Sequence, residues 1–244
     1  MIIIVNGAGG RLGQEVIKAA KSAGHSVVAV DKMGVSPEAT TYRDLADYTG
    51  EADVVIDFSS HLATEELTSY VVKRNLPLVL ATTGQTPEEK EMVFAAAKKV
   101  PLFFSANMSL GVALLISLVK KAASLLPEDD IEIVETHHNR KLDAPSGTAL
   151  ALAEAIQSVR PGAELHRGRD GFGKRTKSEI GIHAIRMGNL AGEHEILIGT
   201  NNQTITLKHE THSRALFAEG ALAAAEFLMK QGPGLYDMKS LLAE

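Results

Sequence analysis

The chain has 244 residues, and at about 150 residues per domain this length predicts one large or two modest domains. Hydrophobic residues make up 45% and charged residues 23% of the sequence, which is a globular composition and excludes a disordered chain. Cysteine is absent, which excludes a thiol nucleophile, an iron–sulfur cluster and a disulfide framework. The net charge of −5 provides no overall attraction for nucleic acid or an anionic membrane, so any anion must bind at a local cluster.

No segment of the sequence has the pattern of a targeting or membrane segment. Residues 1–7 lack the basic region and the length of a secretory signal. The most apolar later stretch, 110–119, has ten residues before two lysines, whereas a membrane span needs about 20. We therefore expect a cytoplasmic protein that does not bind a membrane.

Apolar runs alternate with amphipathic segments through the first hundred residues. The runs are apolar along their whole length, as is typical of strands buried on both faces, and lie at 2–5, 27–30, 54–56, 78–80 and 102–104. Helices are predicted between them: one ends at Gly24, one spans about 64–74, and one starts at Thr86-Pro87. This alternation predicts an α/β fold with a Rossmann-like parallel sheet covered on both faces.

The pattern changes after Asn107. Helices are predicted at about 110–126, 147–159 and 213–230, and strands are predicted at 131–135, 180–186, 195–199 and 204–209. The last three strands alternate with period 2 and are separated by turn signals, which indicates a mixed or antiparallel sheet. The region therefore predicts a smaller α+β domain.

Three regions follow from this change of pattern. We expect a dinucleotide-binding domain at 1–108 and a substrate-binding and oligomerisation domain at 109–212. A C-terminal helix region at 213–244 is expected to pack back on the nucleotide domain.

A glycine-rich turn follows the first predicted strand and consists of Gly7, Ala8, Gly9, Gly10, Arg11, Leu12 and Gly13. Such a turn presents backbone N–H groups at a helix N-terminus, where a pyrophosphate binds. Leu12 occupies the third glycine position of the G-x-G-x-x-G pattern, and a turn that serves packing alone is the alternative. Asp31 follows the second strand 24 residues after Gly7, near the roughly 20 expected for a ribose-binding acid. We therefore predict dinucleotide binding by the segment from Gly7 to Leu12 and by Asp31.

Further cofactor contacts are predicted at the carboxyl ends of other strands. The Asp31 carboxylate would accept ribose hydroxyls and repel a 2′-phosphate, and the neighbouring Lys32 would offset that repulsion. The pair predicts NADH use with tolerance of NADPH, against the alternative of a strand-end acid beside a solvated lysine. The segments after the fourth and fifth strands offer small residues, backbone amides and hydroxyl or amide groups, which suit a carboxamide and a ribose, although Thr and Ser also cap turns. These residues are Ala81, Thr82, Thr83, Ser105, Ala106, Asn107 and Met108.

The segment 135–149, Glu-Thr-His-His-Asn-Arg-Lys-Leu-Asp-Ala-Pro-Ser-Gly-Thr-Ala, places two histidines and two cations between a strand and a helix. Ser146 is a predicted N-cap, after which the amides of Gly147 and Thr148 face an anion site. An anion there would lie near Lys141 and the imidazoles of His137 and His138, as suits a small carboxylate. Zinc is the rival ligand, but adjacent histidines on one extended strand do not easily ligate one metal, so no metal site is predicted. A solvated basic loop is the other alternative.

A second basic segment, 166–177, carries five cations and one acid. It is predicted to be a loop, either a mobile lid that attracts dicarboxylates or a solvated surface loop. Phe172 is its only aromatic residue, so no nucleic-acid binding is expected.

The segment 135–149 resembles the signature of the 4-hydroxy-tetrahydrodipicolinate reductase (dihydrodipicolinate reductase) family of lysine and diaminopimelate biosynthesis. The glycine turn, the segments 81–84 and 105–111 and Ser213-Arg214 resemble it in the same order, so the resemblance covers nearly the whole chain. It implies reduction of a cyclic dicarboxylate by NADH or NADPH with loss of water, in a homotetramer built through the second sheet. The chain departs from the family at Ala81, where Gly is usual, at Asp31, where Glu is frequent, and at Met187, where a small residue is common. The first two departures leave the cofactor preference open.

The resemblance also implies roles for individual residues. His137 is implied in acid–base chemistry, Lys141 as the proton donor and His138 as a substrate contact. The amides of Gly147 and Thr148 would hold a substrate carboxylate, and the cofactor residues would be those predicted above. Two other classes remain open: another two-domain dehydrogenase of a small amino acid or polyol, and a non-catalytic dinucleotide sensor.

Overall fold

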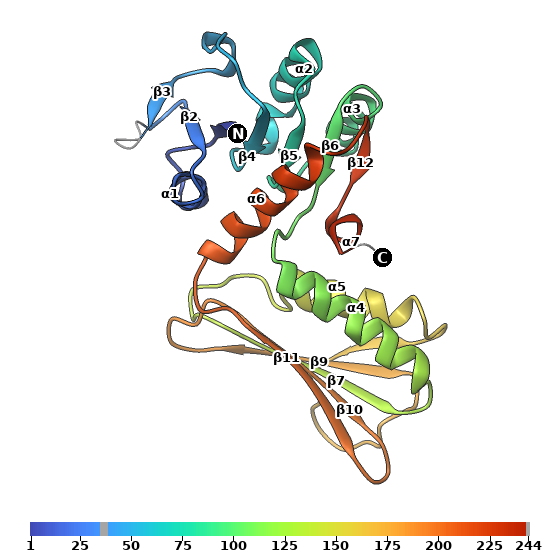
Figure 1. Cartoon of the computed structure of the whole chain (residues 1–244). Helices are drawn as coiled ribbons and strands as arrows, with labels where there is room; N and C mark the ends of the chain where they lie inside the picture. The colour runs from blue at the N-terminus through green and yellow to red at the C-terminus, as the bar shows by residue number, and fades with distance from the viewer. Residues whose placement is uncertain (35–38, 243–244) are drawn as a thin grey trace. The chain divides into compact units, whose positions relative to one another are not determined.

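The computed structural model describes residues 1–34 and 39–242, which form two compact units (Figure 1). Unit 1 contains Met1–Leu110 and the segment from Arg214 onward, and unit 2 contains Gly111–Ser213. Unit 2 is therefore inserted into the chain of unit 1. Among the described residues, no helix combines the length and the apolar character needed to cross a bilayer.

Unit 1 is built on a seven-stranded sheet in which every pairing is parallel. Its strands are β1 (Ile2–Asn6), β2 (Ser26–Val30), β3 (Thr40–Tyr42), β4 (Val54–Asp57), β5 (Leu78–Leu80), β6 (Pro101–Phe104) and β12 (Gly234–Tyr236). The order β12-β6-β5-β4-β1-β2-β3 reverses direction between β1 and β4. A ligand crevice forms at such a reversal, outside the carboxyl ends of the strands. The predicted Rossmann-like sheet is confirmed, with β3 and β12 added at its edges.

Helices cover both faces of this sheet (Figure 1). They are α1 (Arg11–Ser22), α2 (Thr64–Arg74), α3 (Pro87–Ala97) and α6 (Ala215–Leu228), with the shorter η1 (Leu45–Asp47), η2 (His61–Ala63) and α7 (Met238–Leu241). α1 packs against α6, and α2 packs against α3. The predicted start of α3 is confirmed, because the Thr86 hydroxyl accepts a hydrogen bond from the Glu89 N–H and Pro87 occupies the first turn.

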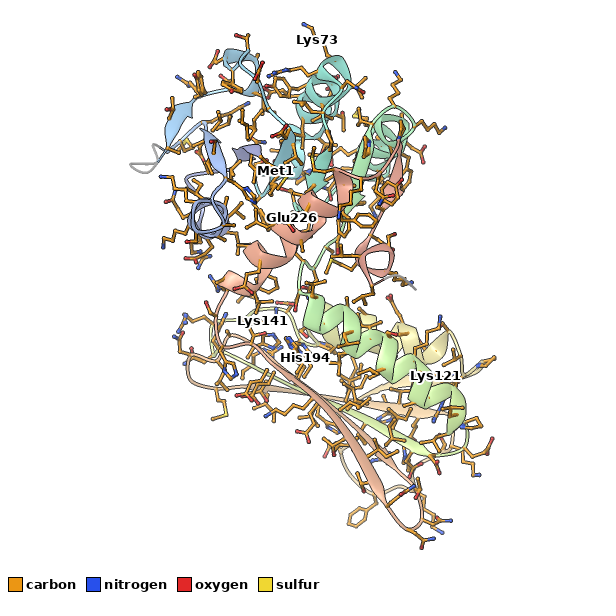
Figure 2. The ribbon with its side chains drawn as sticks, viewed as in Figure 1. Met1, Lys73, Lys121, Lys141, His194 and Glu226 are labelled. Atoms are coloured by element: carbon orange, nitrogen blue, oxygen red, sulfur yellow. The ribbon has the colours of Figure 1, made fainter. Side chains whose placement is uncertain are left out.

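Helix α6, from the last part of the chain, packs back on the first part of unit 1. The amino group of Met1 lies 3.4 Å from Nδ1 of His25, and Nε2 of His25 lies 3.7 Å from the Glu226 carboxylate on α6. Met1 and Glu226 accordingly appear close together in Figure 2. α6 also contacts β4, β5 and β6, and β12, which follows α6, pairs with β6 as the last strand of the sheet.

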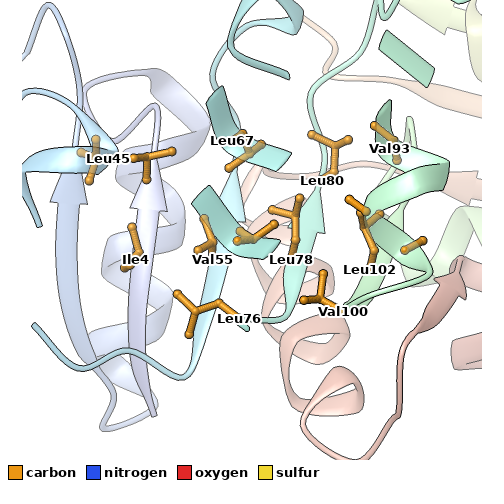
Figure 3. Packing of buried hydrophobic residues seen from close by; sticks show 14 of the residues in the cluster. Ile4, Leu45, Val55, Leu67, Leu76, Leu78, Leu80, Val93, Val100 and Leu102 are labelled. Carbon is orange, nitrogen blue, oxygen red and sulfur yellow. The ribbon is translucent and has the colours of Figure 1, made fainter. Parts of the chain in front are cut away.

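The core under α2 and α3 consists of apolar side chains from alternate strand positions (Figure 3). Val55, Leu78 and Leu102 from the strands meet Leu67 of α2 and Val93 of α3, and all five are almost fully buried. This packing holds the carboxyl ends of the strands in register.

Unit 2 is built on a five-stranded mixed sheet of order β11-β10-β7-β9-β8. Its strands are β7 (Asp130–His137), β8 (Glu164–Arg167), β9 (Glu179–Arg186), β10 (Glu193–Gly199) and β11 (Thr204–Glu210). β7 and β8 are parallel to β9, whereas β10 is antiparallel to both of its neighbours. α4 (Leu110–Leu125) and α5 (Gly147–Gln157) pack on one face, which confirms the predicted α+β unit.

The prediction of a loop over 166–177 is wrong at its start, because His166 and Arg167 belong to β8, an edge strand paired with β9. A strand with one apolar residue among polar ones gives no alternating signal. Arg175 pairs with Asp130 and Glu132 at the beginning of β7, whereas His137 lies at its end. This attachment favours the surface-loop alternative over the lid.

Candidate active site

A cavity of about 700 Å³ lies in unit 1 at the carboxyl ends of β1, β2 and β4, within the range of about 300–1,000 Å³ typical of ligand sites. Five of the predicted cofactor residues line it: Gly7, Gly9, Gly10, Asp31 and Lys32. The cavity therefore lies where the topology places a ligand crevice.

The glycine turn leaves the backbone N–H groups at the N-terminus of α1 without a side-chain cap. Gly10 is the N-cap and supplies no side-chain acceptor, so the first-turn amides can bind an anion. The N–H groups of Gly7 and Ala8 donate to the Val30 carbonyl at 2.9 and 3.1 Å. The Asp31 carboxylate accepts a hydrogen bond from the Gly9 N–H at 2.8 Å, and it also accepts hydrogen bonds from two backbone N–H groups of the turn after β2. Asp31 thus orders the turn as well as lining the cavity.

Lys32 lies between two acids that sequence reasoning missed. Its Nζ is 3.2 Å from the Glu66 carboxylate and 3.4 Å from the Asp44 carboxylate. The hydrogen bond and charge of Glu66, followed by those of Asp44, raise the pKa of Lys32. Both acids line the cavity together with Arg43. The acids come from α2 and from the segment before η1, so only the folded chain brings them to Lys32.

A buried carboxylate organises the carboxyl ends of three strands. Asp57 ends β4 and is 1% exposed. Its Oδ1 accepts from Nδ2 of Asn6 at 2.7 Å and from Oγ of Ser59 at 2.6 Å, and its Oδ2 accepts from Oγ1 of Thr82 at 2.6 Å. Burial raises the pKa of Asp57, and these hydrogen bonds oppose the rise. The Thr82 hydroxyl therefore donates its proton to Asp57, so it can meet a ligand only as an acceptor.

Other predicted cofactor residues do not line this cavity. In the described part of the chain, these are Ala8, Arg11, Leu12, Ala81, Thr82, Thr83, Ser105, Ala106, Asn107 and Met108. The Ser105 hydroxyl donates to the Asn107 carbonyl at 2.7 Å, and Met108 is buried at 2% exposure. The side chains of this segment thus shape the turn between β6 and α4.

The histidine- and lysine-bearing segment lies in unit 2 between β7 and α5. Ser146 is confirmed as the N-cap of α5, since its Oγ accepts from the Ala149 N–H at 3.2 Å. Gly147 and Thr148 follow in the first turn, where helices bind anions. Nζ of Lys141 lies 2.8 Å from the Asp143 carboxylate, and the backbone N–H of Lys141 donates to the His138 carbonyl. One connection therefore carries all the predicted substrate and catalytic residues.

A fully buried carboxylate lies beneath this segment. Glu135, at 0% exposure, has Oε2 at 2.6 Å from Nδ1 of His137 and Oε1 at 2.9 Å from the Ser146 N–H. Arg186 donates to both oxygens at 2.8 Å. Burial alone would raise the pKa of Glu135, but the hydrogen bonds from Arg186, His137 and Ser146 outweigh it, so the pKa is lowered. Glu135 is therefore a carboxylate that only accepts hydrogen bonds.

A second buried histidine adjoins this carboxylate. Nε2 of His194, on β10, lies 2.9 Å from the Ser146 hydroxyl, and its ring packs edge-on against His137 with centroids 5.2 Å apart. Burial, followed by the charge of His137, lowers the pKa of His194 to about 4, so this ring is neutral near pH 7. Figure 2 shows His194 and Lys141 in the same part of unit 2. Within residues 1–34 and 39–242, no three acidic or histidine side chains gather as a metal site.

Sequence reasoning missed Glu135, Arg186 and His194 as site residues. One signal was present: Ile131, Ile133, Glu135 and His137 alternate along β7, which places the acid on the buried face. Arg186 is the register partner of His137, and His194 is that of Glu135. No local pattern specifies either pairing.

Known proteins resemble this chain over nearly its whole length. Two family models match, "Dihydrodipicolinate reductase, N-terminus" over residues 1–108 and "Dihydrodipicolinate reductase, C-terminus" over 111–242. The 4-hydroxy-tetrahydrodipicolinate reductase of Caldanaerobacter subterraneus subsp. tengcongensis is 48% identical, with 98% of this chain and 97% of the relative covered. The corresponding protein of Clostridium novyi is 41% identical at the same coverage.

Solved structures agree with these sequence relatives. The dipicolinate-bound dihydrodipicolinate reductase of Paenisporosarcina sp. TG-14 superimposes with a TM-score of 0.83, at 27% identity and 97% coverage of both chains. An aspartate dehydrogenase of Thermotoga maritima has a TM-score of 0.52 at 14% identity, with 93% of this chain and 96% of that one covered, and shares the fold alone. The chain therefore belongs to the dihydrodipicolinate reductase family, as the motif resemblance predicted.

Proposed function

We propose that the chain reduces 4-hydroxy-tetrahydrodipicolinate to tetrahydrodipicolinate, with loss of water and with NADH or NADPH as reductant. The reaction is a step of lysine and diaminopimelate biosynthesis. Relatives that carry this activity in their name match the chain nearly end to end. The observation that carries the proposal is the segment of unit 2 that places Lys141, His137 and the N-terminus of α5 together.

The residues of unit 1 fit a nicotinamide dinucleotide, which supplies a hydride when bound. The cavity at the carboxyl ends of β1, β2 and β4 has the size of a nucleotide site. The first-turn amides of α1 suit the pyrophosphate, and Asp31 retains acceptor capacity for a ribose hydroxyl.

The residues of unit 2 fit a cyclic dicarboxylate. We assign one substrate carboxylate to the amides of Gly147 and Thr148, where the helix dipole of α5 favours negative charge. Lys141 adds positive charge, and both Lys141 and His138 add hydrogen-bond donors nearby. The solved relative from Paenisporosarcina was obtained with dipicolinate, a planar ring with two carboxylates.

The proton chemistry follows from the same segment. Loss of water from the 4-hydroxy compound gives a conjugated ring, and addition of a hydride to an electron-poor ring carbon moves negative charge toward the ring nitrogen. The product then needs one proton, which we assign to the Lys141 ammonium, while His137 exchanges protons with the substrate through Nε2. The Asp143 carboxylate, 2.8 Å from Nζ, orients the ammonium.

The test is the Lys141→Ala variant. A general acid contributes about 10²–10⁴ in rate, so kcat should fall at least 100-fold while the Kd for NADH changes less than twofold. NADH oxidation is followed by absorbance with the product of dihydrodipicolinate synthase as substrate. Lys120→Ala, on the exposed side of α4, is the control and should keep full activity. Undiminished turnover of Lys141→Ala would remove the assigned role.

We also propose a cytoplasmic homotetramer that assembles through the sheet of unit 2. The face of β7 and β10 opposite α4 and α5 carries Val134 and Leu197, both half-buried. Apolar side chains on such a face support an association of subunits. Light scattering should give four times the subunit mass of 26.0 kDa.

A further inference from the structure

We propose that Glu135 is a positioning residue for the reduction: its two oxygens join the acid–base imidazole of His137 to the anion-binding N-terminus of α5. Arg186 and His194 belong to the same buried cluster of polar side chains as Glu135 and His137. This inference rests on the proposed function for the roles of His137 and α5, and it adds three residues that touch neither substrate nor cofactor.

The first oxygen of Glu135 sets the tautomer of His137. Oε2 lies 2.6 Å from Nδ1, and a carboxylate can only accept, so Nδ1 must carry the proton. Nε2 is then the ring atom that faces a substrate. A Cβ at Gly192 would lie 2.9 Å from Nε2, so the absence of a side chain at this position keeps the space beside the reactive atom open.

The second oxygen of Glu135 fixes the start of α5. Oε1 accepts from the Ser146 N–H at 2.9 Å, and Ser146 is the N-cap whose hydroxyl binds the Ala149 N–H. The N-cap conformation decides where the first-turn amides point. One carboxylate thereby holds the base and the anion site at a constant separation.

The positive charge of Arg186 stabilises the buried carboxylate of Glu135. A fully buried carboxylate is strongly destabilised unless it is paired and hydrogen-bonded. The guanidinium donates to both oxygens, and it also donates to the Asp143 carbonyl at 2.7 Å, two residues after Lys141. The pair therefore connects to the backbone that carries the proposed proton donor.

His194 is a second link between His137 and the N-terminus of α5. Its ring packs against His137, and its Nε2 lies 2.9 Å from the Ser146 hydroxyl. Besides His137, the titratable groups around Glu135, Arg186 and His194 are Lys141 and Asp143 from the connection and His209 from β11. A purely structural ion pair would need only Arg186 and Glu135, whereas here every remaining contact of the carboxylate goes to a site element.

The first experiment reads the tautomer directly. In protein labelled with ¹⁵N-histidine, neutral His137 should show a protonated Nδ1, and the signals are assigned with His137→Gln. In Glu135→Gln the amide nitrogen can face Nδ1, so His137 should shift toward the Nε2–H tautomer. A protonated Nε2 in the neutral ring of the wild type overturns the proposal, even if Glu135→Gln does not fold.

The second experiment measures turnover. Loss of a partner that orients a metal-ligating histidine costs about 10–100-fold, and we expect a loss of the same order for the orientation of His137. The kcat of Glu135→Gln should therefore fall by that factor, with an altered acidic limb of the pH profile and an unchanged Kd for NADH. In a His137→Gln background the same change should lower kcat less than twofold, because residues that act as a unit are not additive. Independent, multiplicative losses would refute positioning through His137.

The third experiment addresses the anion site with dipicolinate as the probe. Ser146→Ala removes the hydroxyl that accepts from Ala149, so the Kd for dipicolinate measured by calorimetry should rise several-fold more than kcat falls. An unchanged Kd would refute the part of the proposal in which the Ser146 N-cap positions the anion site of α5. Failure of the wild type to oxidise NADH with the cyclic substrate would instead overturn the proposed function, while the tautomer measurement would still decide the role of Glu135.

Discussion

The glycine turn of unit 1 offers a test that separates packing from ligand binding. Gly13 lies in α1 and is buried against the turn. A Cβ at Gly13 would lie 2.2 Å from the Gly7 carbonyl oxygen and 2.9 Å from Cα of Ala8. Both neighbours are backbone atoms, and the turn is held by the bonds from Gly7 and Ala8 to the Val30 carbonyl. Gly13→Ala must therefore push α1 away from the turn.

The magnitude follows from two opposing effects. Overpacking of this kind costs about 1–3 kcal/mol, and two backbone neighbours place Gly13 in the upper part of that range. Replacing a helical glycine by alanine returns about 1 kcal/mol of helix propensity. The expected net loss is about 1–2 kcal/mol, which lowers the Tm of a chain of this size by about 2–8 °C.

Gly10→Ala is the matched control in the same turn. Gly10 has φ −71° and ψ 162°, which any residue adopts, and its Cβ would lie 3.2 Å from the Gly7 carbonyl oxygen. It should lose less than about 1 kcal/mol as an N-cap change, yet its methyl group enters the cavity and should weaken NADH binding at least tenfold. Thermal unfolding and NADH titration by calorimetry measure the two effects. A Gly13→Ala protein as stable as Gly10→Ala would refute the reasoning.

Two further predictions concern charge. Glu66→Gln removes one of the two acids beside Lys32, so the KM for NADPH should fall several-fold while the KM for NADH stays within twofold. Glu65→Gln, on the same helix but outside the cavity lining, is the control. Equal shifts of the two KM values in Glu66→Gln would contradict the prediction. His194, with its pKa lowered to about 4 by burial, binds its proton less tightly when folded than when unfolded, so its contribution to stability is complete above about pH 6.5 and is lost as the pH falls toward 4. Over that window the free energy of unfolding should drop by up to about 3 kcal/mol from this group, measured by urea unfolding. His194→Gln should lack this drop, and parallel curves for the two proteins would disprove it.

The elements that the sequence predicted well are those whose signal is local. β1, β4 and β5 are continuous apolar runs, and the start of α3 has both its cap and its proline. β3, Thr-Thr-Tyr, and β12, Gly-Leu-Tyr, are three-residue edge strands that offer too short a pattern to recognise. Their existence depends on pairing with β2 and β6.

The candidate site divides in the same way. The connection from His137 to Thr148 is one continuous stretch and was predicted as such. The contact of Glu135 with Arg186 joins residues 51 apart, and that of Ser146 with His194 joins residues 48 apart. Both contacts depend on which strand lies beside β7 and in which register, and pairing register is a property of the whole sheet.

The insertion of unit 2 into unit 1 has a consequence for biosynthesis of the chain. All strands and helices of the inserted unit have been translated by residue 213, whereas the nucleotide-binding half still lacks α6 and β12. On the ribosome, unit 2 is thus the first part of the chain whose residues are all present to form its native core. Residues 1–110 cannot complete the core of unit 1 until the residues from Arg214 onward have been synthesised. Loss of the final thirty or so residues, by a premature stop codon or a protease, would damage the N-terminal half of the gene product and spare its centre.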